Sequence, residues 1–158
     1  MSISIGVIGS ANPGESDWET AYIVGNEIAK KGAVLVCGGC EGIMEAACKG
    51  ASENGGTTVG ILPGNERHSA NPYVDIPIVT GMGEARNVIV VRSSQALIAV
   101  SGGWGTLSEI SFALKLNIPV IGINTWDVSA EILMMDDPVE AVNKAYKFAL
   151  AKEGKGKP

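Results

Sequence analysis

The architecture of the chain is clearest in one stretch of ten residues, Ala33-Val34-Leu35-Val36-Cys37-Gly38-Gly39-Cys40-Glu41-Gly42. Its first half is apolar at every position, which is typical of a parallel strand covered by helices on both faces. A half-exposed antiparallel strand would alternate polar and apolar residues instead. Its second half holds three glycines and leads into a helical pattern over residues 43–54. The stretch therefore predicts the strand-loop-helix unit of an α/β protein.

Strands and helices alternate in the same way on both sides of this stretch. The expected strands span residues 3–8, 33–37, 58–62, 75–79, 96–100 and 119–123. The expected helices span residues 16–31, 43–54, 106–116 and 138–152. Because the connections are short, we expect one Rossmann-like, doubly wound domain over residues 1–153, with a mostly parallel sheet and helices on both faces. Residues 154–158 have nothing to bury and are expected to form a disordered tail.

Residues 84–94 allow two interpretations. The β-branched run from Arg86 to Arg92 suits a strand as well as a helix. As a helix, it is apolar nearly all round and must be covered on more than one side. A small domain often achieves this by packing against a second subunit.

The composition excludes several classes of protein. With 46% apolar and 18% charged residues in a chain of 158, a disordered chain is excluded. The net charge of -5 has the wrong sign for a protein that neutralises nucleic-acid phosphates. No apolar run approaches the roughly 18 residues of a membrane span, and the first residues lack the basic start of a secretory signal. We therefore expect a cytoplasmic protein, and its three cysteines suit free thiols in a reducing compartment.

Three glycine-rich loops follow expected strands: Gly9-Ser10-Ala11-Asn12, Gly38-Gly39-Cys40-Glu41-Gly42 and Gly102-Gly103-Trp104-Gly105-Thr106. Ligands of open parallel sheets bind beyond the carboxyl ends of the strands, where glycine amides and helix N-termini suit a phosphate. We expect the amides of the second and third loops to converge on one pocket. Neither a complete G-x-G-x-x-G nor a Walker A loop is present, so a dinucleotide dehydrogenase and a P-loop NTPase are not supported. Tight turns without any ligand are the alternative explanation of these glycines.

Two longer motifs carry a resemblance to a known family. Gly38-Gly39-x-x-Gly42-x-Met44-Glu45 and Gly102-Gly103-x-Gly105-Thr106-x-x-Glu109 resemble the paired signatures of LONELY GUY (LOG) proteins. Those proteins are nucleoside-monophosphate phosphoribohydrolases, in a superfamily that also includes molybdenum-cofactor carrier proteins. With the run from Thr80 to Asn87, the chain looks closest to the short, carrier-like bacterial branch. It departs from the pattern at Ser101, where a proline usually stands, and at Gln95, where an acidic residue is frequent.

The resemblance implies that Arg86 and Glu109 form the catalytic pair. A carboxylate beside the ribose can stabilise the oxocarbenium-like state of N-glycosidic cleavage, and an arginine can clamp a phosphate or the leaving base. Two plainer interpretations stay open: Glu109 and Thr106 have the spacing of a helix capping box, and Arg86 can form a surface or interface salt bridge. The residues expected to contact the ligand are Gly9, Ser10, Gly38, Gly39, Gly42, Met44, Asn87, Gly102, Gly103, Trp104, Gly105 and Thr106.

Three further residue types have weaker functional interpretations. Cys37 and Cys40 have C-x-x-C spacing, but Cys37 ends an apolar strand, so we predict neither a redox nor a metal site. Trp104 stacks on a base or pterin, or it covers the end of the sheet. His68, the only histidine, is expected in an exposed loop, with a substrate lid as the alternative. The lysines of the predicted helices show no pyridoxal-phosphate motif, which disfavours lysine decarboxylase activity.

Together these observations give three functional hypotheses. The first is a domain that binds a nucleoside monophosphate or a similar phosphorylated heterocycle, requires no further cofactor, and hydrolyses the N-glycosidic bond. The alternative is a non-catalytic carrier or sensor of a molybdopterin-type cofactor or nucleotide. The third is a structural dimer with a vestigial site. In each case the resemblance implies a homodimer or homotetramer.

Overall fold

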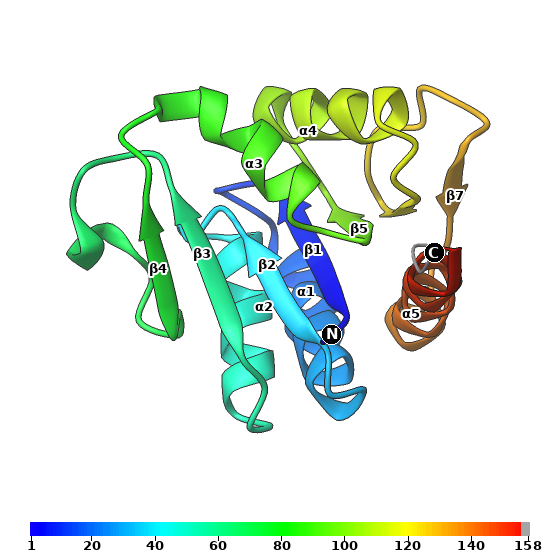
Figure 1. Ribbon diagram of the computed structural model, residues 1–158, viewed down its shortest axis with the longest axis horizontal. Helices are drawn as coiled ribbons and strands as arrows, with labels where there is room; N and C mark the ends of the chain where they lie inside the picture. The colour runs from blue at the N-terminus through cyan, green and yellow to red at the C-terminus, as the bar shows by residue number, and fades with distance from the viewer. Residues whose placement is uncertain (156–158) are drawn as a thin grey trace.

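Seven parallel strands form one sheet in the computed structural model, which describes residues 1–155 (Figure 1). Their order in the sheet is β4-β3-β2-β1-β5-β6-β7. The strands are β1 (Ser4–Gly9), β2 (Val34–Cys37), β3 (Thr58–Leu62), β4 (Ile76–Val79), β5 (Ala96–Val100), β6 (Val120–Ile123) and β7 (Ile132–Met134). The sheet is thus wholly parallel, where a mostly parallel one was predicted.

Helices cover both faces of this sheet and enclose two apolar cores. One face packs against α1 (Glu15–Lys30), α2 (Ile43–Ser52) and α5 (Pro138–Lys155). The other packs against α3 (Asn87–Arg92) and α4 (Trp104–Lys115). Short 3-10 turns span Arg67–Ser69 and Gly83–Arg86. The two-sided layering confirms the doubly wound, Rossmann-like class that the apolar strands predict.

The strand order places a switch point beside β1. The chain winds outward from β1 to β4 and then returns to β5 on the other side of β1. Gly9, the last residue of β1, pairs with Val100, the last of β5. The loops that follow these two strands therefore leave the same edge of the sheet together, where ligands of this fold class bind.

The structure differs from the sequence prediction at a few boundaries. The strand β7 was not predicted, because it has only three residues and lies at the edge, with Leu133 and Met134 exposed. α4 begins two residues before the predicted start. α5 continues through Lys155, so Gly154 and Lys155 are helical where a tail was expected, and residues 156–158 lie outside the described part.

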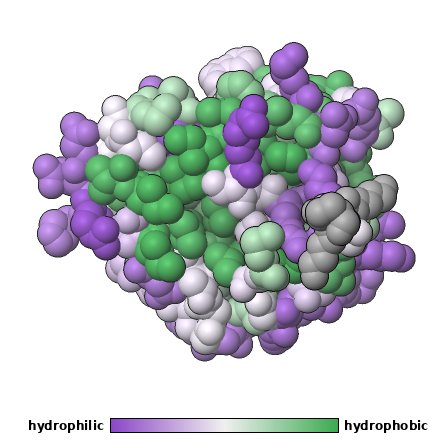
Figure 2. Space-filling model, in the orientation of Figure 1, coloured by the Kyte–Doolittle hydropathy of each residue, from purple (hydrophilic) through white to green (hydrophobic). Residues whose placement is uncertain are grey.

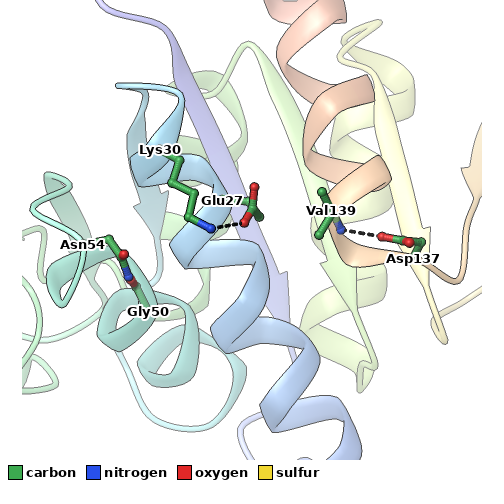
Figure 3. Close-up of polar contacts among 6 residues, drawn as sticks. All are labelled: Glu27, Lys30, Gly50, Asn54, Asp137 and Val139. Atoms are coloured by element: carbon green, nitrogen blue, oxygen red, sulfur yellow. Dashed lines mark hydrogen bonds and ion pairs between the residues drawn. The ribbon is translucent and has the colours of Figure 1, made fainter.

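Local polar contacts hold the outer helices (Figure 3). Lys30 forms an ion pair with Glu27 at 2.6 Å on α1, and the Asn54 amide donates to the Gly50 carbonyl at the end of α2. The Asp137 carboxylate accepts the Val139 N–H at 2.8 Å and so caps α5. In the part of the chain that the structure describes, none of the helices has both the length and the apolar character needed to cross a membrane.

Candidate functional site

A cleft of about 350 Å³ opens at the carboxyl ends of β1 and β5. Its walls come from the loop after β1, from the segment that ends the 3-10 turn and begins α3, and from the first two turns of α4. The residues that line it are Gly9, Ser10, Ala11, Asn12, Met44, Arg86, Asn87, Gly103, Gly105, Thr106 and Glu109. The cleft therefore occupies the switch-point position that the strand order favours.

Most of the predicted site residues meet in this cleft. Nine of the lining residues were predicted from the sequence, and both members of the proposed catalytic pair are among them. Ala11 and Asn12 were not singled out, although they belong to the first glycine loop. The predicted residues that do not line the cleft are Gly38, Gly39, Gly42, Gly102 and Trp104.

The glycines of the first motif lie behind the cleft wall, which differs from the expectation that their amides enter a common pocket. Gly39 donates its N–H to the Cys37 sulfur at 3.3 Å and accepts the Asn71 N–H at 2.9 Å. Gly42 has a φ of 72° and packs against the main chain of the loop after β1. The next residue, Ile43, donates to the Ser10 carbonyl at 3.0 Å. The first motif thus positions the loop after β1 and reaches the cleft only through Met44.

Arg86 is held by main-chain and amide oxygens and by no carboxylate. Its Nε donates to the Ile61 carbonyl at 2.9 Å, and its Nη2 donates to the Gly38 carbonyl at 3.3 Å. Its Nη1 donates to the Asn87 side-chain oxygen. Among residues 1–155, no carboxylate oxygen lies within 4 Å of this guanidinium. Within the described chain Arg86 therefore forms no surface salt bridge, and its positive charge faces the cleft without a counter-ion there; a salt bridge across an interface with another chain stays a prediction.

A chain of hydrogen bonds continues from Arg86 to the other wall. The Asn87 amide donates to the Ser108 hydroxyl at 3.1 Å, and that hydroxyl donates to the Gly105 carbonyl at 2.6 Å. Asn87 is buried and Ser108 is half-buried, while the bond from the Ser108 hydroxyl to the Gly105 carbonyl is exposed. These hydrogen bonds join the start of α3 to the start of α4 and fix the width of the cleft between them.

Glu109 is a buried carboxyl group in the second turn of α4, 7% exposed. Burial raises its pKa to about 8, while the positive charge of Arg86 acts in the opposite direction. The helix begins at Trp104 with Gly103 as its N-cap and no side-chain capping bond, so the capping-box alternative for Thr106 and Glu109 is wrong. At pH 7 the carboxyl group is mostly protonated and can donate a hydrogen bond into the cleft.

The main chain at the start of α4 is accessible from the cleft. A Cβ atom added at Gly103 would meet no atom within 4 Å, and one at Gly105 would first meet the Asn87 side-chain nitrogen at 4.0 Å. The first N–H groups of a helix have no acceptor within it, and they carry a partial positive charge. The chain enters this helix through Ser101, whose φ of 57° is unusual for a residue with a side chain. The open end of α4 therefore suits an anion.

The remaining candidates lie apart from the cleft. Cys37 contacts Cys48 at 3.5 Å and not Cys40; the hydrogen bond with Cys48 and burial raise the pKa of the Cys37 thiol well above its usual value. Such a thiol is unreactive. No cluster of three or more His, Cys, Asp or Glu side chains suitable for a metal occurs in residues 1–155. His68 is exposed in the 3-10 turn Arg67–Ser69, as expected for a loop histidine.

Sequence comparisons agree with this architecture. A model of the SLOG cluster4 family matches residues 2–151. An uncharacterized protein of Archaeoglobus fulgidus is 48% identical over 141 residues, which cover 89% of this chain and 93% of that protein. A cytokinin riboside 5′-monophosphate phosphoribohydrolase of Mycobacterium tuberculosis is 36% identical over 111 residues, which cover 68% of this chain and 59% of the enzyme. The chain thus matches little more than half the length of that enzyme.

Solved structures place the chain more narrowly. The molybdenum cofactor binding protein of Rippkaea orientalis aligns with a TM-score of 0.87 at 38% identity, covering 93% of this chain and 96% of that one. The molybdenum cofactor carrier protein of Chlamydomonas reinhardtii aligns with a TM-score of 0.87 at 37% identity, covering 96% and 99%. The chain therefore belongs to the SLOG cluster4 family, in the LOG-like superfamily and close to its molybdenum-cofactor-carrier branch.

Proposed function

We propose that the cleft binds a nucleoside 5′-monophosphate or a similar phosphorylated heterocycle. The observation that carries this proposal is the pairing of an uncompensated cation with an open helix start. Within residues 1–155 Arg86 has no carboxylate partner, and Gly103 and Gly105 leave the first amides of α4 accessible beside it. A phosphate would satisfy both groups, since arginine and helix N-termini each favour bound anions.

We propose that the same cleft hydrolyses an N-glycosidic bond of that ligand. Breaking the bond between C1′ and the base develops positive charge on the ribose, and water then adds to C1′. Ionised Glu109 would stabilise that charge or accept a proton from the attacking water, and the base leaves with the electron pair of the C1′–N bond and takes up a proton from Glu109 or from solvent. Arg86 would hold the phosphate or the departing base, because its guanidinium stays protonated. Since burial raises the pKa of Glu109 to about 8, the rate would increase as the pH rises toward that value.

The test is a panel of nucleoside 5′-monophosphates incubated with the full chain, with free base and ribose 5-phosphate as the measured products. We expect turnover that falls at least about 100-fold in Glu109→Gln. Glu41→Gln, at an exposed acid in the loop after β2, serves as the control and should retain the wild-type rate. Equal rates in Glu109→Gln and the wild type would exclude the catalytic half of the proposal.

The protonation state of Glu109 favours the alternative function, that of a non-catalytic carrier. A carboxyl group that is neutral at pH 7 does not stabilise a developing cation, which favours retention of a ligand over its cleavage. Proteins that bind or carry the molybdenum cofactor are among the structures that this chain resembles along nearly its whole length. A carrier should hold a molybdopterin-type cargo through purification, so mass spectrometry of the purified protein distinguishes the two candidates.

The proposal includes a second copy of the chain. α3 and α4 leave part of their sheet face uncovered, and Ile76 and Ile78 of β4 are 49% and 44% exposed there, beside half-buried Val59. Figure 2 shows hydrophobic side chains gathered where β3 and β4 lie in Figure 1. Pairing through the β4 edge is disfavoured, because Pro77 has no N–H and its carbonyl accepts Arg67 at 3.2 Å.

Charges at the ends of the neighbouring segment favour a second copy as the covering partner. Glu84 and Arg92 are exposed at opposite ends of residues 83–92. A two-fold axis across this segment would bring Glu84 of one copy to the partner's Arg92, and the reverse. We place this dimer in the cytoplasm, where the three free cysteines would remain reduced.

A further inference from the structure

The wall of the cleft presents no aromatic surface to a heterocycle. Its walls are main chain, small polar side chains, the Arg86 guanidinium, the Glu109 carboxyl and Met44, and no aromatic ring is among the lining residues. These groups suit a phosphate and a sugar. A base or pterin attached to them needs its stacking surface elsewhere, at the rim.

Trp104 supplies such a surface at the rim. It is the first residue of α4 and stands between Gly103 and Gly105, which both line the cleft. Its side chain is 79% exposed, the highest value for a large apolar residue in the described chain after Met1. An indole ring exposed at this position presents a large apolar area that a bound heterocycle can cover.

The ring of Trp126 packs against the ring of Trp104. The two ring centroids lie 5.4 Å apart with an interplanar angle of 31°, and the Trp126 Nε1–H donates to the Gly103 carbonyl at 3.1 Å. Trp126 also packs against the apolar core on the α4 side of the sheet. Trp104 is therefore supported on one face and open on the rest of its surface, without being buried in the core.

We infer that Trp104 is the stacking surface for the planar heterocycle of the ligand, and that it separates ligands with a flat ring system from bare sugar phosphates. This inference rests on the proposed function, because it assigns the phosphate-bearing half of the ligand to the cleft. Stacking tolerates any flat π-system, so it would serve a purine or a pterin equally.

The experiment measures the binding of AMP and of ribose 5-phosphate to the full chain by isothermal titration calorimetry. In Trp104→Ala we expect AMP to bind about 5- to 150-fold more weakly, the range of base-stacking losses on alanine substitution. Ribose 5-phosphate, which lacks a ring to stack, should bind within about twofold of the wild type. Trp104→Phe should restore most of the AMP affinity, because it keeps an aromatic face.

Two further measurements separate stacking from a general structural effect. Phe112→Ala removes another exposed aromatic side chain from α4 and should leave both affinities unchanged. AMP should quench the tryptophan fluorescence of the wild type and lose that effect in Trp104→Phe. If Trp104→Ala binds AMP as the wild type does, or loses both ligands equally, stacking is excluded and the proposed function stands. If the wild type binds neither probe, both proposals fall.

Discussion

The guanidinium of Arg86 lies directly against the main chain of Gly38. Its Nη2 donates to the Gly38 carbonyl at 3.3 Å, and a Cβ atom on Gly38 would stand 2.6 Å from the same nitrogen. Gly38, the first glycine of its motif, therefore affects the cleft indirectly, through the position of the Arg86 side chain. The glycines of this motif leave room for the arginine and do not line the cleft themselves.

Gly38→Ala should displace Arg86 while the fold persists. The added methyl group needs the space of the guanidinium, which can move because it is the end of a flexible side chain. We expect ribose 5-phosphate to bind roughly 10- to 100-fold more weakly, the cost of losing a hydrogen bond to a charged group. Calorimetry with Gly14→Ala as the control checks this, since Gly14 has open space around it. Wild-type affinity in Gly38→Ala would refute the displacement.

Substitutions at two other glycines should have different effects, one on the stability of the fold and the other on ligand affinity. Gly42→Ala places a side chain at a φ of 72° and against the carbonyls of Ser10 and Ala11, so we expect a loss of more than about 2 kcal/mol in urea unfolding. Gly105→Ala replaces glycine within a helix and should stabilise the chain by up to about 1 kcal/mol. Its methyl group nevertheless narrows the cleft opposite Asn87, so ligand affinity should fall. Wild-type stability in Gly42→Ala, or tighter ligand binding in Gly105→Ala, would contradict these two predictions.

Glu109 should make stability depend on pH. Burial raises its folded pKa from 4.5 to about 8, so between these pH values the folded chain keeps a proton that the unfolded chain has released. This contribution to stability is complete below about pH 4.5, falls by at most about 1.4 kcal/mol per pH unit as the pH rises, and is lost above about pH 8. Glu109→Gln should lack that slope. Parallel stability profiles of the two proteins in urea between pH 5 and 8.5 would contradict the raised pKa.

Ile78→Asp should yield a monomer. It puts a charge into the uncovered sheet face, where Ile78 is 44% exposed, and should therefore oppose dimerisation more than folding. Sedimentation velocity at micromolar concentration measures the change, with Val139→Asp on α5, 38% exposed, as the control that remains dimeric.

The charge pattern gives the dimer a second, independent check. Glu84→Arg or Arg92→Glu alone should weaken association, because each sets like charges against one another across the two-fold axis. The double exchange should restore it. A wild type that sediments as a monomer, or a double variant as weak as the single ones, would rule out this interface.

The sequence predicted the helices and strands, and the meeting of Arg86 with Glu109 in one cleft, better than the roles of individual glycines. Apolar runs such as residues 33–37 fix both the strand and its burial, so they can be recognised without coordinates. Glycine motifs are ambiguous, because Gly38 and Gly103 follow equivalent strands yet one backs the wall and the other lines it. That difference depends on the Arg86 side chain, which arrives from a segment 48 residues away. A local sequence pattern cannot predict a contact between residues this far apart in the chain.

The backbone at Ser101 bears on how relatives of this chain can be compared. A proline ring fixes φ near −65°, so a chain with proline here cannot copy the φ of 57° and must leave β5 along another path. It would also lack the N–H that Ser101 donates to Ile123 at 3.1 Å. Two proteins with identical glycine motifs can therefore bind their ligands at different distances from the sheet. The residue directly before the motif, Ser101 here, distinguishes the two backbone paths.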